Sequence, residues 1–173
     1  MILGPDGRPY RKTASAIAPR DFAKPGYMGV VEVKGVWDEP GHPDHGKVVE
    51  YHKHNTITYD ARKVMARAIA GDNAGHIVTV GWGTDDTAAQ RSDTALFNQV
   101  ITSAVVMPVT YPPDDQSVVF TSVLVRGTGT GYTYKEAGLI SQGGLLFARF
   151  VFPTGIYKFP QLRLTVNWQI IFI

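Results

Sequence analysis

Residues 162–173 read Leu-Arg-Leu-Thr-Val-Asn-Trp-Gln-Ile-Ile-Phe-Ile, and this stretch decides the fold. Polar residues separate the apolar ones as far as residue 169. The alternate apolar positions are Leu162, Leu164, Val166, Trp168, Ile170 and Phe172. Because successive side chains of a strand point to opposite faces, the pattern predicts a half-buried strand with these six on the buried face. An unpaired apolar strand invites aggregation, so we expect a sheet or a neighbouring subunit to cover it.

Other segments with strand patterns precede this one, separated by turns rich in glycine, proline and aspartate. They are residues 28–36, 47–58, 76–82, 100–109, 117–125, 132–140 and 145–152. The first two are joined by residues 38–46, which contain two prolines and two glycines, and are expected to form a hairpin with a long tip. Together the segments predict an all-β, jelly-roll-like β-sandwich of about eight strands.

One segment has a helical pattern instead. Asp60 is a suitable N-terminal cap, and Gly71 is a suitable stop. Between them Val64, Met65, Ala68 and Ile69 recur at helical spacing. We therefore expect one short helix, which would close one end of the sandwich.

The N-terminal 26 residues show neither the two-residue period of a strand nor the 3.6-residue period of a helix, and they contain four prolines. We therefore predict that they form an extended arm, followed by one domain of residues 27–173. The arm carries a net charge of +3, whereas the rest of the chain sums to −1. It is either a solvated tail or a segment that orders on a partner. Its candidate partner-binding residues are Arg8, Tyr10, Arg11, Lys12, Ile17, Arg20 and Phe22.

Size and charge restrict the classes of protein. With 173 residues, 44% of them hydrophobic, the chain is long enough for one well-buried core. A net charge of +2 lacks the basic excess of a dedicated nucleic-acid binder, so no nucleic-acid partner is expected. The absence of cysteine excludes disulfides and thiolate metal sites. No secretion signal or apolar membrane span is evident, which predicts a soluble protein made in a cytoplasm, without a membrane partner.

Candidate chemical sites are weak. Glu50, His52 and His54 share one face of a predicted strand and could ligate zinc, with His42, Asp44 and His45 on the preceding loop. Exposed strand histidines are common, however, so no metal or other cofactor is predicted. The glycine-rich residues 127–131 lack both the lysine and the following helix of a phosphate-binding loop, and are interpreted as a strand connection.

Catalysis and sugar binding also find little support. No glycine-flanked nucleophilic serine is present, so the protein is not expected to be an enzyme. The acidic pairs Asp85–Asp86 and Asp114–Asp115 suit Asx turns or an occasional calcium contact better than acid–base catalysis. A carbohydrate-binding module remains an alternative, with Trp37 and Trp82 as the indoles available for stacking.

The order of several motifs resembles a family of small virion proteins of tailed bacteriophages. They are His54-Asn55-Thr56-Ile57, Val80-Gly81-Trp82-Gly83-Thr84-Asp85 with Ser92-Asp93-Thr94-Ala95-Leu96, Lys135-Glu136-Ala137-Gly138-Leu139-Ile140, Leu146-Phe147-Ala148-Arg149-Phe150, and Tyr157-Lys158 with residues 162–168. The resemblance covers residues 47–173 and leaves out the arm. It implies a jelly-roll capsid decoration (cement) protein that stabilises the shell of major capsid protein, located in the virion. A tail-fibre, adaptor or baseplate component is the alternative that it leaves open.

The same resemblance implies a homotrimer. Ile171 and Ile173 interrupt the polar face of the last strand, where a monomer would expose them. We therefore predict that these two residues lie in an oligomer interface or against another virion protein. The arm, in this interpretation, reaches along the major capsid protein.

Overall fold

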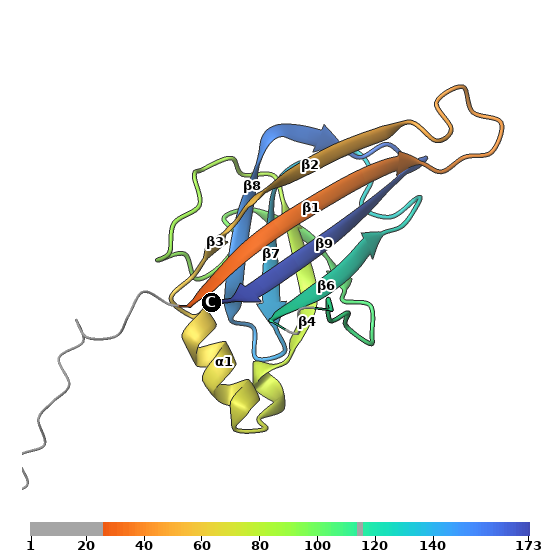
Figure 1. The fold of residues 1–173 in the computed structure, drawn as a ribbon. Helices are drawn as coiled ribbons and strands as arrows, with labels where there is room; N and C mark the ends of the chain where they lie inside the picture. The colour runs from red at the N-terminus through yellow and green to blue at the C-terminus, as the bar shows by residue number, and fades with distance from the viewer. Residues whose placement is uncertain (1–25, 114–115) are drawn as a thin grey trace, which may run out of the picture.

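The last strand lies inside a sheet. The computed structural model describes residues 26–113 and 116–173 (Figure 1). Within them β9 (Leu162–Phe172) pairs antiparallel with β1 (Tyr27–Trp37) on one side and with β6 (Ser117–Leu124) on the other. On its far side β1 pairs with β2 (Val48–His54), giving the order β2-β1-β9-β6. The predicted hairpin is confirmed, with Val36 opposite Val48 beside its long tip.

The second sheet has five strands in the order β3-β8-β7-β4-β5. They are β3 (Thr56–Ile57), β4 (Ile77–Gly83), β5 (Gln99–Ala104), β7 (Thr133–Ser141) and β8 (Leu146–Tyr157), and the paired neighbours are antiparallel. The chain crosses between the sheets from β2 to β3, β5 to β6, β6 to β7 and β8 to β9. The predicted all-β sandwich is therefore confirmed, with nine strands among the described residues.

The core lies between the two sheets. Leu162, Leu164, Val166, Trp168 and Ile170 are at most 2% exposed, which confirms the predicted buried face of β9. Phe172 is the exception, because the end of β9 reaches the open edge of the sandwich and leaves its ring 45% exposed. Trp82 and Tyr134 from the second sheet pack edge to face, with ring centroids 5.8 Å apart. The interior is thus built from alternate positions of both sheets, as periodicity predicts.

One predicted strand is divided. Residues 47–58 pair with β1 only as far as His54, and the chain then crosses to the second sheet as β3. The backbone N–H of Asn55 donates to Gly29 O at 3.2 Å at the crossing. The prediction of one continuous strand was wrong because a crossover within an alternating pattern leaves the alternation almost unchanged.

The predicted helix is present as α1 (Ala61–Ile69), followed by the short 3-10 helix η2 (Asn73–Gly75). It covers one end of the sandwich, where Ala61 and Val64 are buried (Figure 1). Gly71, at φ +74°, ends it as expected, with its N–H bonded to Ala68 O and the next N–H to Arg67 O. Two details differ from the prediction. The Asp60 side chain makes no capping hydrogen bond and instead pairs with Lys63 at 2.7 Å, while Ile69 is 88% exposed.

Candidate interaction surface

The side chains that were considered as possible zinc ligands are not gathered into one site. His52 and His54 are exposed on β2, while His42, Asp44 and His45 lie at the tip of the β1–β2 hairpin. His42 Nδ1 accepts a hydrogen bond from the Asp44 N–H at 3.0 Å, which serves the turn. Within residues 26–113 and 116–173, no group of three or more histidine, aspartate and glutamate side chains is placed to hold a metal ion.

The indoles proposed for sugar stacking are engaged elsewhere. Trp82 is fully buried, and its Nε1 donates to Ser103 Oγ at 2.8 Å, so its predicted availability was wrong. Trp37 is half-buried, stacks on His42 with centroids 5.2 Å apart and also contacts Phe159. The signal was misleading for Trp82 because the flanking glycines, which look like a turn, belong to a core strand.

The glycine-rich residues 127–131 form a strand connection, as the sequence predicted. Residues 127–131 join β6 to β7, and the N–H groups of Gly127 and Gly131 donate to Pro160 O and Lys158 O. Lys158 is itself fully buried, and its ammonium group donates to the backbone oxygens of Val125, Phe159 and Leu162. Burial lowers the pKa of Lys158. These contacts tie together the connections at the end of the sandwich away from α1.

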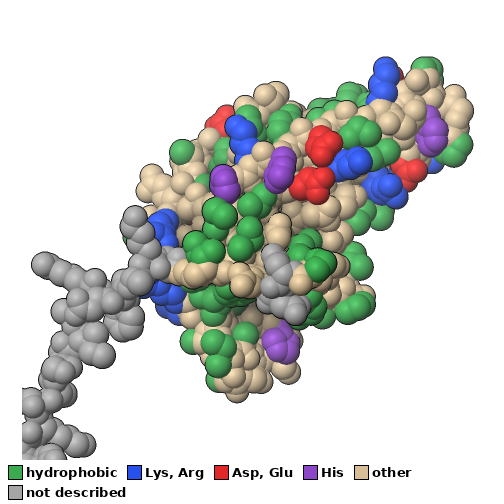
Figure 2. Space-filling model, viewed as in Figure 1, with side chains coloured by type: hydrophobic (Ala, Val, Ile, Leu, Met, Phe, Trp, Pro, Cys, Tyr) green, Lys and Arg blue, Asp and Glu red, His purple; other side chains and the backbone are tan. Residues whose placement is uncertain are grey.

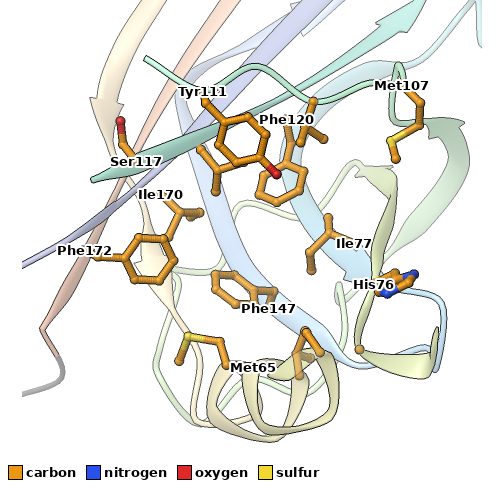
Figure 3. A pocket seen from close by; sticks show the side chains of 15 residues that line it. Met65, His76, Ile77, Met107, Tyr111, Ser117, Phe120, Phe147, Ile170 and Phe172 are labelled. Carbon is orange, nitrogen blue, oxygen red and sulfur yellow. The ribbon is translucent and has the colours of Figure 1, made fainter. Parts of the chain in front are cut away.

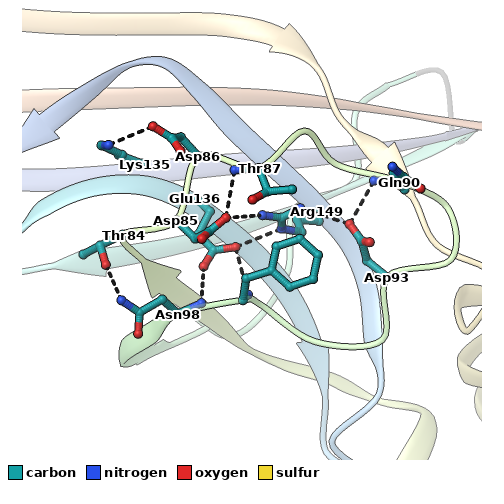
Figure 4. Close-up of polar contacts among 11 residues, drawn as sticks. Thr84, Asp85, Asp86, Thr87, Gln90, Asp93, Asn98, Lys135, Glu136 and Arg149 are labelled. Atoms are coloured by element: carbon teal, nitrogen blue, oxygen red, sulfur yellow. Dashed lines mark hydrogen bonds and ion pairs between the residues drawn. The ribbon is translucent and has the colours of Figure 1, made fainter.

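A buried ion cluster, which sequence reasoning missed, lies on the outer face of the second sheet (Figure 4). Arg149 of β8 is fully buried, and its Nε donates to Glu136 of β7 at 2.8 Å. Its Nη1 donates to Asp93 at 3.0 Å, and its Nη2 lies 3.8 Å from an Asp85 oxygen. The Phe97 ring covers the guanidinium, with the carbon at its centre 4.3 Å from the ring centroid. One cation thus serves three carboxylates.

The ion cluster holds residues 84–98 against the sheet. Glu136 accepts hydrogen bonds from the N–H groups of Phe97 and Asn98, at 3.2 and 2.8 Å. Asp93 accepts one from the N–H of Gln90 at 2.8 Å. Carboxylates that receive both backbone N–H groups and a guanidinium are well compensated for their burial. The cluster therefore fastens a long connection to the sheet.

Glycines make room for this connection. Gly81 and Gly138 are opposite each other on β4 and β7, and Leu96 lies over both of them. A Cβ at either glycine would come within 2.9 Å of a Leu96 methyl carbon. The motifs that carry the phage resemblance therefore meet here, since they contribute the two glycines, Leu96 and the charged residues of the ion cluster.

The acidic pair Asp85–Asp86 behaves as predicted for a turn. Asp85 accepts a hydrogen bond from the Thr87 N–H at 2.8 Å, which is an Asx turn. Hydrogen bonds from Thr87 and the nearby charge of Arg149 lower the pKa of Asp85. Asp86 pairs with Lys135 at 2.8 Å, which lowers the pKa of Asp86 as well. Asp114 and Asp115, the other predicted pair, lie outside the described residues.

An apolar pocket of about 480 Å³ lies at the helical end of the sandwich, and we call it the end pocket (Figure 3). Phe147, Ile77, Phe120 and Ile170 line its interior, and α1 forms one wall through Met65 (Figure 3). The complete lining is Val64, Met65, Ala68, Gly75, His76, Ile77, Met107, Val109, Tyr111, Ser117, Val118, Phe120, Phe147, Ile170 and Phe172. It is therefore an apolar recess with few polar groups, suited to binding apolar side chains.

Exposed apolar side chains surround the end pocket. Met107 and Tyr111, from the connection between β5 and β6, are 71% and 68% exposed, and Phe172 of β9 is also exposed. Hydrophobic side chains gather in this region of the space-filling view, below the charged and histidine side chains along the four-stranded sheet (Figure 2). Several exposed apolar side chains around a recess are typical of a site of association.

The two residues predicted for an oligomer interface lie beside this surface. Ile171 is half-buried on the outer face of β9, opposite Met28, and Ile173 is 80% exposed. The Ile173 N–H donates to Gly26 O, which joins the two ends of the described chain. The predicted arm residues Arg8, Tyr10, Arg11, Lys12, Ile17, Arg20 and Phe22 all lie outside the described residues.

Comparisons with known proteins identify no relative: no family model, no curated protein and no solved structure matches the chain. Across the described parts of the chain, none of the helices has the length and apolar character needed to cross a membrane.

Proposed function

We propose that this chain is a non-enzymatic structural protein of a tailed-phage virion, a capsid decoration protein that binds and stabilises the shell of major capsid protein. The observation that carries the proposal is the apolar surface around the end pocket, set on a sandwich whose connections are fastened by buried contacts. A rigid domain with one apolar end suits a protein that works by association. The choice of a phage capsid as the assembly rests on the order of the sequence motifs, which resembles that of phage virion proteins.

Association as a homotrimer is part of this proposal. Ile173 is exposed beside Phe172, so an interface here would bury both of them together with Ile171. Repeated contacts on a symmetric shell strengthen one another through avidity, so each one need bury only a modest area. The basic arm would extend the contact along the major capsid protein.

The location in the particle is tested by labelling native virions with an antibody against residues 26–173. Label over the whole shell supports a decoration protein. Label confined to the tail would replace it with the alternative, a tail-fibre or baseplate component. Absence of label from purified virions, together with binding on a glycan array, would favour the carbohydrate-binding module instead.

The oligomer interface is tested by changing Ile171 and Ile173 to Asp together and measuring the mass in solution by light scattering. We expect a trimeric wild type and a monomeric variant, because two buried carboxylates at each interface would lack partners. Ile69→Asp is the matched control, since Ile69 is 88% exposed on α1 and does not line the end pocket. An unchanged mass in the double variant would contradict the assignment.

A further inference from the structure

The end pocket lies where the N-terminal arm leaves the fold. Tyr27, the first residue of β1, is opposite Phe172 of β9, and Phe172 lines the pocket. Gly26 O accepts a hydrogen bond from the Ile173 N–H, so the described chain begins beside the end of β9, one strand away from the side on which β6 lines the pocket. Twenty-five residues of the chain precede this point and lie outside the described structure. The pocket and the start of the arm are therefore neighbours.

The arm contains side chains that suit the pocket. Phe22 is four residues before Gly26 and Ile17 is nine residues before it. At about 3.5 Å per extended residue, they can reach roughly 14 and 30 Å from Gly26. The pocket lining includes Phe120, Phe147 and Ile170, which would bury such apolar groups. Arg20 and Asp21 lie between the two and can stay in water at the rim.

We propose that the end pocket binds residues 17–22 of the same chain, with Phe22 and Ile17 as the apolar anchors. The same chain is favoured over a second copy because a short tether holds the segment at an effective concentration of about millimolar. Docking would also cover the exposed rim residues Met107 and Tyr111. The inference concerns the free protein, and its test does not require a virion. On assembly the arm would have to leave the pocket before the surface around the pocket, and the arm itself, could make the contacts proposed above.

The chain has no cysteine, which allows a clean test by disulfide trapping in the full-length protein. One variant carries Ala18→Cys with Ala68→Cys, and the matched control carries Ala18→Cys with Ala66→Cys. Ala66 and Ala68 are both exposed on α1, but only Ala68 lines the pocket. Positions two apart are about 200° apart around a helix, so the two cysteines face different ways at a similar distance from the arm.

Under dilute oxidising conditions, we expect the Ala68 pair to close within one chain about tenfold faster than the Ala66 pair. Adding Phe22→Ser to the Ala68 pair should reduce its rate to that of the control. Non-reducing electrophoresis separates linkage within a chain from linkage between chains. Equal rates for the two pairs, a rate that Phe22→Ser leaves unchanged, or a disulfide between two chains would each overturn the proposal.

Discussion

The ion cluster buries charged groups, whereas the end pocket leaves apolar groups exposed on the same sandwich. Around Arg149, charged groups are buried, paired and covered by residues 84–98, so this side of the second sheet is closed. At the helical end, apolar groups such as Met107 and Phe172 are left exposed around a recess. Buried charges that are paired with one another hold one local structure in place. Exposed apolar side chains are free to contact another protein or another segment of the chain. The first region therefore serves the fold, and the second is available for binding.

The largest effect is expected from removing the cation of the ion cluster. Arg149→Met leaves Glu136 and Asp93 buried without their partner, and should lower the free energy of unfolding by about 3–5 kcal/mol. Urea denaturation measures the change. Arg163→Met is the control, because Arg163 makes an exposed pair with Asp38 at 3.7 Å and should cost less than about 1 kcal/mol. Equal losses of stability in Arg149→Met and Arg163→Met would contradict the structural importance of the buried ion cluster.

An intermediate effect is expected where the connection touches the sheet. A Cβ at Gly83 would lie 2.6 Å from Asn98 O and closer still to the Glu136 carboxylate, so Gly83→Ala should destabilise by about 1–3 kcal/mol through overpacking. Thermal unfolding followed by circular dichroism gives the shift. In Gly35→Ala the Cβ would meet the flexible ends of Leu164 and Leu162, at 3.0 and 3.4 Å, and no backbone atom is among its nearest contacts, so a smaller loss is expected. A larger loss of stability in Gly35→Ala than in Gly83→Ala would show that residues 84–98 shift readily to accommodate the added methyl group.

A smaller effect is expected on the stability of the protein at acidic pH. The pKa of Asp85 is lower in the folded protein than its ordinary value of 3.8, chiefly through its hydrogen bonds with Thr87. The contribution of the Asp85 carboxylate to stability is therefore fully present at pH values above 3.8, and it is lost as the pH falls through the lower pKa of the folded protein. Asp85→Asn should make stability less sensitive to pH below about 4. Urea midpoints measured across this range test it, and an acid dependence identical to the wild type would count against the role of Asp85.

The smallest effect on stability is expected at the rim of the end pocket. Met107→Ser with Tyr111→Ser should change the free energy of unfolding by less than about 0.5 kcal/mol per substitution, because both side chains are largely exposed. The measurement is the urea midpoint beside that of Arg149→Met. A loss above about 2 kcal/mol would mean that the rim is part of the core.

Local patterns predicted most of the strands and the helix, because each depends on neighbours in sequence. Alternation identified the inner face of β9 as far as Ile170, and Gly71 marked the end of α1. The division of residues 47–58 was missed, since a strand that changes sheets keeps its alternation. Trp82 was misplaced because Gly81 and Gly83 resemble a turn, although they serve close approach of residues 84–98.

The two sites were harder to predict, since each joins residues distant in the chain. Asp93, Glu136 and Arg149 meet only because β7 and β8 are paired and the connection folds back over them. A signal was present: Glu136 and Arg149 are charged residues inside apolar strand segments, which indicates buried pairing. The end pocket has no such signal, because apolar residues of a core and of an open recess are the same in sequence.

The position of β9 between β1 and β6 also has a consequence for synthesis of the protein. The β1–β2 hairpin and β6 share no direct pairing, so the four-stranded sheet can close only after residues 162–172 have left the ribosome. Until then β1 and β6 present open edges, and Val31 and Val33 of β1 are exposed to solvent. Closure joins segments more than a hundred residues apart, a topology that folds slowly. The nascent chain is therefore expected to depend on chaperones until its last strand is inserted.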